Sequence, residues 1–313
     1  MKIPESGIPK LPTKEQLEEA IKEYETINWD EVNLKQVDSV IPWPLKAMIY
    51  PIMEHDSEMY YYRVRPYHSF DSKNFQNDNI FRVKSFSYPP KGTLSRCGTI
   101  EKPVFYAASN LEAALIESKS KDTLNFVGCW KLKPEKKMLT RPYISNLPKG
   151  EVEHVDEFLS MFNSILDNLL KQNFSEEQRE IFKRLEVFHD QQFTKDGDTS
   201  YKYSSWLANK NFNIKETKNN KAPNAIVYQS TIDSRLGTNF AIKPNFVDES
   251  MELKDCYLIT LRYNQNTERY SRILLSVGVP NKPIISWHEP TSLDFEKFKK
   301  LHHVPIHAAL INS

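Results

Sequence analysis

The sequence predicts an α+β protein from the order of its elements, and its composition and glycine spacing add two further constraints. Short apolar strands and longer amphipathic helices are interspersed along the 313 residues without the regular strand–helix–strand rhythm of a parallel α/β sheet. The hydrophobic fraction of 39% is sufficient for a real core in a chain of this length. The eight glycines are too widely spaced for a G-x-G-x-x-G turn or a phosphate-binding loop. Any nucleotide site must therefore be built without a glycine-rich loop.

The charge and cysteine content argue against several classes of protein. The chain has 42 Lys and Arg against 41 Asp and Glu, and a net charge of +1 disfavours general binding to nucleic acid or acidic membranes. Cys97, Cys129 and Cys256 are far apart, which fits free thiols in a reducing compartment. No run approaches 18 apolar residues and the first residues lack the apolar core of a signal peptide, so we expect a cytoplasmic protein.

The chain opens with a predicted helix. Residues 13–27 carry apolar side chains at helical spacing, and Thr13 with Gln16 forms a capping box. Prolines at positions 42, 44 and 51 then predict an irregular segment up to about residue 57.

The next predicted elements are strands separated by a short helix. Residues 59–65 predict a strand that Pro66 ends, and residues 103–107 predict a second, buried strand. Ser109 and Glu112 have the spacing of a capping box, which predicts a helix that continues to Glu117. A third strand is predicted over residues 126–132, followed by a proline-bounded loop.

The second half of the chain is predicted to begin with two helices and to end with strands. The helices lie between residues 152 and 193, and Ser175 with Gln178 caps the second one. We interpret their apolar stripes as core packing. A polar loop around Asn219 follows, and Ser292 is expected to cap a last short helix. Between them, strands are predicted over residues 225–229, 240–242, 256–262 and 273–277.

Three histidines near the C-terminus invite a metal-binding interpretation, which we reject. His303 and His307 are four residues apart, with His302 adjacent. Pro305 disfavours the helical turn that such a pair requires, and no acidic partner is spaced for it. We therefore expect no metal site.

The segment with most chemical information is the strand end at residues 105–109 and the helix that follows. It places an aromatic ring, Tyr106, and a carboxylate, Glu117, on one short rigid stretch. On spacing alone, Tyr106 also fits an ordinary core position and Glu117 a solvated helical position. Both interpretations stay open at this point.

The order of four motifs along the chain resembles a known family. YRVRP stands at residues 62–66, PP at 89–90 before Arg96, PVFYA at 103–107 before Glu117, and AIVYQS at 225–230 before GTNFA at 237–241. This succession resembles the RES domain, named for its Arg, Glu and Ser, which is the toxin of a bacterial toxin–antitoxin family. The resemblance divides the chain into a helical N-terminal extension (residues 1–57), a RES-like NAD-binding catalytic domain (58–249) and a C-terminal β-hairpin plus helix packed on the core (250–313).

The resemblance implies a fold and an activity. The fold would be a split β core related to the ADP-ribosyltransferases, with surrounding helices. The activity would be cleavage of the nicotinamide–ribose bond of NAD, by hydrolysis or phosphorolysis, which depletes cellular NAD. NAD would then be the substrate, and no cofactor is expected. Two alternatives stay open: a mono-ADP-ribosyltransferase that modifies a protein or nucleic acid, and a non-catalytic binding module in which the motifs are structural.

The resemblance also implies a partner. RES toxins are usually neutralised by a small helix-turn-helix antitoxin protein. No membrane or nucleic-acid partner is expected, and the oligomeric state stays open.

Four residues are the candidates for catalysis: Glu117, Arg63, Tyr106 and Ser230. Departure of nicotinamide leaves an oxocarbenium-like ribose, which calls for a carboxylate near the developing charge, and Glu117 is the candidate for that role. Tyr106 offers a ring for stacking on nicotinamide, and Ser230, at a strand end, offers a hydroxyl for the ribose or amide.

NAD also brings a pyrophosphate, which the planar fork of a guanidinium fits. The resemblance assigns Arg63 and Arg96 to it, and Arg65 competes for the role because it shares a strand face with Arg63. Asn239 matches the family's Gly-x-Asn element and is assigned to NAD as well. The family usually has Asn two residues after its second arginine, whereas this chain has Gly98, so one expected hydrogen bond is in doubt.

Overall fold

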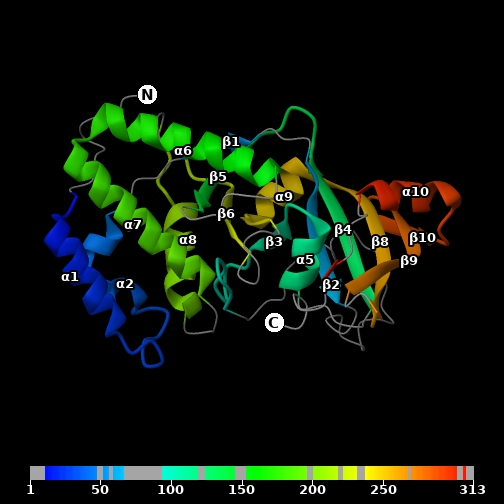
Figure 1. Ribbon diagram of the computed structural model, residues 1–313, viewed down its shortest axis with the longest axis horizontal. Helices are drawn as coiled ribbons and strands as arrows, with labels where there is room; N and C mark the ends of the chain where they lie inside the picture. The colour runs from blue at the N-terminus through cyan, green and yellow to red at the C-terminus, as the bar shows by residue number, and fades with distance from the viewer. Residues whose placement is uncertain are drawn as a thin grey trace. The chain divides into compact units, whose positions relative to one another are not determined.

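The computed structural model describes residues 11–47, 52–55, 59–66, 94–118, 124–144, 153–195, 200–217, 221–230, 237–266, 269–301 and 306–307. Helices and mostly antiparallel strands are mixed through these ranges, which confirms the predicted α+β class (Figure 1). The chain divides into two units of three segments each. Unit 1 comprises residues 1–54, 91–103 and 139–231, and unit 2 comprises residues 55–90, 104–138 and 232–313. Within the described ranges, no helix has the length and apolar character needed to cross a membrane.

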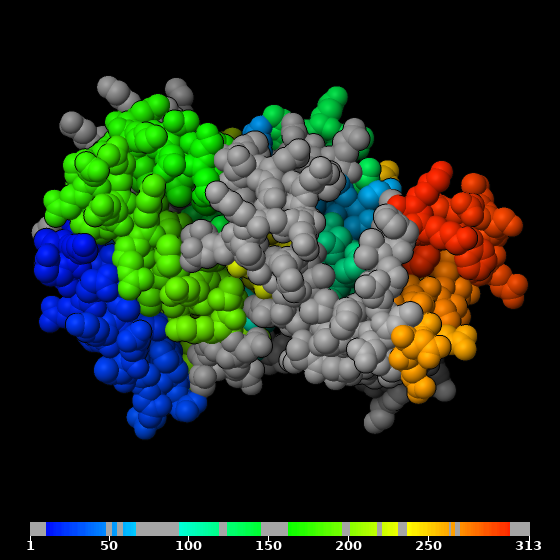
Figure 2. Space-filling model, viewed as in Figure 1, coloured from blue at the N-terminus to red at the C-terminus, as the bar shows by residue number. Residues whose placement is uncertain are grey.

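Unit 1 is mainly helical. Its first helix, α1 (Lys14–Glu25), begins at the predicted capping box, in which the side chains of Thr13 and Gln16 each accept from the other's backbone amide. The predicted pair α6 (Glu153–Asn173) and α7 (Glu176–Thr194) is also confirmed, with Ser175 and Gln178 forming the cap of α7. Both α1 and α8 (Ser200–Phe212) pack on α7, and the blue surface of α1 adjoins the green helices in Figure 2.

The remaining elements of unit 1 are short. The segment expected to be irregular contains α2 (Val37–Val40), the 3-10 helix η2 (Trp43–Lys46) and β1 (Met53–His55). The proline-bounded loop predicted after residue 132 contains a strand, β5 (Met138–Tyr143), that sequence patterning missed. It pairs in parallel with the predicted strand β6 (Ala225–Gln229), Thr140 opposite Ala225.

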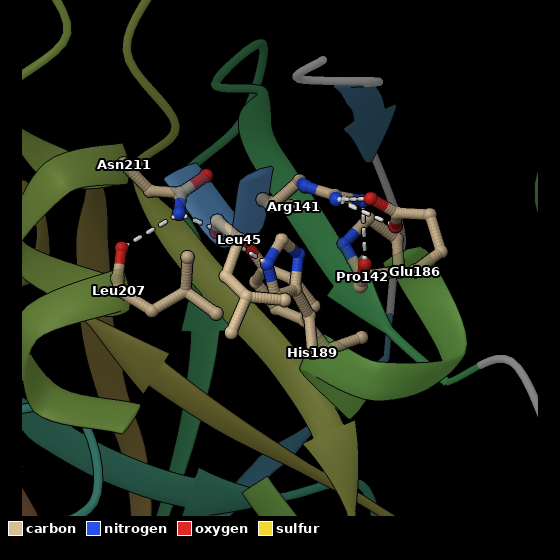
Figure 3. A network of polar contacts seen from close by, with 8 residues as sticks. Leu45, Arg141, Pro142, Glu186, His189, Leu207 and Asn211 are labelled. Atoms are coloured by element: carbon tan, nitrogen blue, oxygen red, sulfur yellow. Dashed lines mark hydrogen bonds and ion pairs between the residues drawn. The ribbon is translucent and has the colours of Figure 1, made fainter. Parts of the chain in front are cut away.

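A buried polar network connects these elements of unit 1 (Figure 3). Arg141 Nη2 donates to both carboxylate oxygens of Glu186, at 2.7 and 2.6 Å, and both side chains are buried. His189 is fully buried one turn further along α7, with Nε2 3.1 Å from the carbonyl oxygen of Leu45. Burial lowers the pKa of His189 to about 3, so the imidazole is neutral. Asn211 on α8 donates to the carbonyl oxygen of Leu207 at 2.7 Å.

Unit 2 is built on an antiparallel sheet with the strand order β7-β3-β2-β4-β8-β9-β10. The predicted strands are present, and the two after residue 250 are much longer than predicted because they form a hairpin of their own. The strands are β2 (Tyr61–Pro66), β3 (Phe105–Ala108), β4 (Leu124–Leu132), β7 (Thr238–Ile242), β8 (Met251–Asn264), β9 (Arg269–Asn281) and β10 (Ile284–His288), with β11 (Ile306–His307) paired to β9.

The helices described in unit 2 are α5 (Leu111–Glu117), α9 (Pro244–Ser250) and α10 (Ser292–Leu301). The apolar side of α5, with Leu111, Leu115 and Ile116, packs on one face of the sheet together with Tyr62 and Val127. Near β2 and β3, α5 therefore covers one face of the sheet.

Two predicted helix caps are corrected by one residue. The N-cap of α5 is Asn110, whose side chain accepts from Ala113 N at 2.8 Å. Ser109 is taken by another partner, because its Oγ accepts from Thr238 N at 3.1 Å. At α10 the capping side chain is Thr291, which accepts from Asp294 N, and Ser292 is already helical.

Candidate active site

The carboxylate predicted to be catalytic contacts the predicted NAD-binding asparagine. Glu117 is the half-buried last residue of α5, and Asn239 lies on β7 with 4% of its surface exposed. Asn239 Nδ2 donates to Glu117 Oε1 at 2.9 Å. The contact arises because Asn239 is opposite Ala108 in the β3–β7 ladder, and the chain turns from Ala108 into α5, which lies back on the same sheet. Two residues 122 positions apart are thus brought together.

Tyr106 is half-buried in the middle of β3. It is opposite Ala241 in the ladder, and side chains alternate along a strand. The side chains of Tyr106 and Asn239 therefore belong to the same face of the sheet as α5.

Arg63 belongs to the other face. Tyr62 packs with α5, so alternation directs Arg63 and Arg65 away from that helix. Arg63 is 7% exposed, its guanidinium carbon lies 5.0 Å from the centre of the Phe105 ring, and Nη1 donates to the carbonyl oxygen of Tyr106 at 2.8 Å. Arg63 thus contacts the backbone of the residue whose ring faces the Glu117 side.

The electrostatic environment of Arg63 is unusual for a buried cation. Burial and the neighbouring charge of Arg65 lower the pKa of Arg63 to about 9, and burial also lowers the pKa of Arg65. Among the described residues, no carboxylate pairs with Arg63, and its buried Nε has no hydrogen-bond partner. A buried guanidinium without a counter-charge favours a bound anion, which would supply the missing acceptor oxygens.

The sheet of unit 2 is weakest between the strands that carry Arg63 and Tyr106. Within the described part of the chain, β2 pairs with β4 at six positions and β3 pairs with β7 at four, but β2 and β3 pair only at Tyr62 and Ala108. Beyond this pair, a side-chain hydrogen bond from the Arg63 guanidinium to the Tyr106 carbonyl oxygen connects the two strands. We call this place the β2/β3 joint.

The two other predicted site residues belong to unit 1. Arg96 is 7% exposed and donates from Nη1 to the carbonyl oxygens of Phe193 and Lys195 at the C-terminal end of α7, the latter at 2.8 Å. Its guanidinium carbon lies 4.9 Å from the centre of the Tyr201 ring. Ser230 is buried immediately after β6. Glu117, Asn239, Tyr106, Arg63 and Arg65 form the set within unit 2.

Sequence reasoning missed the residues that tie β7 to the start of α5. Ser109 N donates to Thr238 O at 2.9 Å, and Thr238 N donates back to Ser109 Oγ at 3.1 Å. Gly237 has a φ of 143°, a conformation that favours glycine. The glycine two residues before Asn239 was the only signal in the sequence. In the part of the chain that the structure describes, no cluster of three His, Cys, Asp or Glu side chains could hold a metal; His302 and His303 lie outside that part.

Comparisons with known proteins identify no family. No family model matches the chain, and a search of curated proteins finds no match.

Proposed function

We propose that this protein is a RES-type enzyme that cleaves the nicotinamide–ribose bond of NAD. The observation that carries the proposal is the pairing of Glu117 with Asn239. These are two of the residues that the resemblance assigns to NAD, they are 122 positions apart, and no local pattern requires them to meet. Their contact is what a shared role at one substrate predicts.

Glu117 supplies the negative charge that the reaction needs. The bond between the ribose carbon and the nicotinamide nitrogen breaks, nicotinamide leaves with the electron pair, and the ribose becomes oxocarbenium-like. A carboxylate beside the ribose stabilises that positive charge. Asn239 donates to Glu117 Oε1 and so holds the carboxylate in one orientation. Water or phosphate then adds to the ribose carbon and loses a proton.

Arg63 supports the proposal because it is suited to the pyrophosphate of NAD. A buried guanidinium that has no carboxylate partner among the residues with a described placement is suited to a pyrophosphate, with Arg65 on the same strand face as a second cation. Glu117 and Arg63 belong to opposite faces of the sheet, so the proposal requires that one NAD molecule reaches both faces. The short β2–β3 ladder at the β2/β3 joint is consistent with the split β core that the resemblance implies.

The remaining roles rest on the resemblance alone, which assigns Tyr106 to nicotinamide stacking, Ser230 to the ribose or amide, and Arg96 to the pyrophosphate. In the cell, the activity depletes NAD, and an antitoxin protein holds it in check.

The test is product analysis of NAD incubated with the pure protein, with and without phosphate. We expect release of nicotinamide together with ADP-ribose or its phosphorylated form. Glu117→Gln should lose at least a hundredfold in rate while its thermal unfolding is unchanged. Glu296→Gln, an exposed glutamate of α10, is the matched control and should retain the wild-type rate. NAD left intact with water, phosphate and a cell lysate all supplied as acceptors would overturn the proposal.

A further inference from the structure

The helix that carries Glu117 is held to β7 at both of its ends. At the C-terminal end, Glu117 accepts from Asn239. At the N-terminal end, Ser109 and Thr238 exchange two hydrogen bonds, from Ser109 N to Thr238 O at 2.9 Å and from Thr238 N to Ser109 Oγ at 3.1 Å. Thr238 and Asn239 are consecutive, so the same two residues of β7 reach both ends of α5.

Close packing at Gly237 reinforces the connection. A Cβ on Gly237 would lie 2.6 Å from Ser109 Oγ and 2.7 Å from Asn110 Nδ2, which is nearer than real Cβ atoms approach other atoms. Asn110 is the N-cap of α5. The residues just before the helix therefore pack directly on the Gly237 backbone. The side chains of Ser109 and Asn110 fill the space that a Cβ on Gly237 would need.

These contacts form a closed circuit. It runs from Ala108 across the ladder to Asn239, back through Thr238 to Ser109, along the seven residues of α5, and from Glu117 to Asn239 again. A circuit of this kind fixes the carboxylate relative to β7 more precisely than a single hydrogen bond, because each contact restricts the others. Ser109 Oγ is a side-chain acceptor in this circuit that lies outside the predicted site.

We propose that Ser109 is a positioning residue for Glu117: by holding Thr238, it keeps the Asn239 amide on the Glu117 carboxylate. This inference rests on the proposed function for its catalytic consequence, but the contact itself can be tested without NAD. Ser109 does not touch the substrate, so its effect is transmitted through Thr238 and Asn239.

The first experiment follows the Asn239 side-chain amide by NMR in protein labelled with 15N-asparagine. The resonance pair that disappears in Asn239→Ala identifies the amide. Glu117→Gln removes the charged acceptor and should move the pair. Ser109→Ala should move it as well, and Ser109→Thr, which keeps the hydroxyl, should restore it. The matched control is Ser276→Ala, which removes a serine hydrogen bond to the His288 carbonyl elsewhere in unit 2 and should leave the pair in place. An Asn239 pair unaffected by Ser109→Ala would overturn the inference.

The second experiment measures nicotinamide release. Ser109→Ala should lower kcat about tenfold with KM for NAD changed less than twofold, because the phosphates still bind while the carboxylate is displaced. In the Asn239→Ala background, Ser109→Ala should have no further effect, since the two residues act in series. A full, additive loss in that background would overturn the inference. Wild-type protein that leaves NAD intact would instead overturn the proposed function, and the NMR result would still decide whether Ser109 holds Asn239 on Glu117.

Discussion

The side-chain amide of Asn239 donates to Glu117 Oε1 at 2.9 Å, so a neutral amide contacts the candidate catalytic carboxylate. Replacing the amide by a second carboxyl group would place two acids at hydrogen-bond distance, where both cannot ionise readily.

We therefore predict that Asn239→Asp shifts the pH–rate profile of NAD cleavage upward by about one pH unit or more, because the pKa of the carboxyl pair rises. Asn239→Ala is the comparison. It removes the hydrogen bond without adding a charge, so it should lower the rate and shift the profile by less than Asn239→Asp does. Superimposable profiles for Asn239→Asp and wild type would contradict the prediction.

We predict that Arg63 contributes to the affinity for NAD without stabilising the folded protein. Arg63→Met removes a buried cation that no carboxylate balances in the described ranges, at the loss of one hydrogen bond worth about 1 kcal/mol. We expect the free energy of unfolding to stay level or rise, and the affinity for NAD to fall at least tenfold. Inorganic pyrophosphate should raise the Tm of the wild type, since a ligand that binds only the native state stabilises it, and should have little effect on Arg63→Met. Equal Tm shifts in the two proteins would argue against an anion site at Arg63.

Gly237→Ala should destabilise the protein by about 1–3 kcal/mol, because a φ of 143° is strained for alanine and the added Cβ meets Ser109 Oγ. Chemical denaturation gives the free energy of unfolding. We also expect nicotinamide release to fall, since Asn239 lies two residues away. A Gly237→Ala variant with wild-type stability would contradict this prediction, because it would show that Ser109 and Asn110 make room for the Cβ without loss of stability.

His189 should make unit 1 sensitive to acid. Its pKa is about 3 in the folded protein and 6.5 in its ordinary state, so the unfolded chain binds one more proton between these values. The stability that the neutral imidazole contributes is present above pH 6.5 and is lost as the pH falls, by about 1.4 kcal/mol per pH unit.

Denaturant unfolding of wild type and His189→Gln at a series of pH values checks this prediction. Arg141 and Glu186 are present in both proteins, so the difference between the two curves isolates His189. The difference should shrink as the pH falls below 6.5. Parallel curves down to pH 4 would contradict the assignment.

Local signals predicted α1, α6 and α7 of unit 1, missed α8, and failed where distant residues compete. Thr13 with Gln16 and Ser175 with Gln178 cap their helices as predicted, because both partners of each box lie within one turn. Ser109 has the same local pattern but does not cap α5, since Thr238, 129 residues later, engages its hydroxyl. β5 was missed for a similar reason. Its strand character comes from its pairing with β6, more than 80 residues further along the chain.

For the candidate site, the sequence predicted the residues but not the contacts between them. The order of the motifs named Glu117, Asn239, Tyr106 and Arg63, and the structure groups all four in unit 2. The contacts between them were beyond prediction, because each depends on a ladder register that no single strand encodes. The opposite orientation of Arg63 and Asn239 follows from strand parity only once Tyr62 and Ala108 are known to be partners.

The alternation of unit 1 and unit 2 along the chain has a consequence for synthesis on the ribosome. Unit 1 ends with residue 231, and the last segment of unit 2 starts at residue 232, so neither unit can finish folding from an N-terminal half alone. Glu117 emerges 122 residues before Asn239. At elongation rates of about 5–20 residues per second, the nascent chain carries the carboxylate without its partner for roughly ten seconds. The proposed activity therefore requires a chain that has been synthesised at least as far as Asn239.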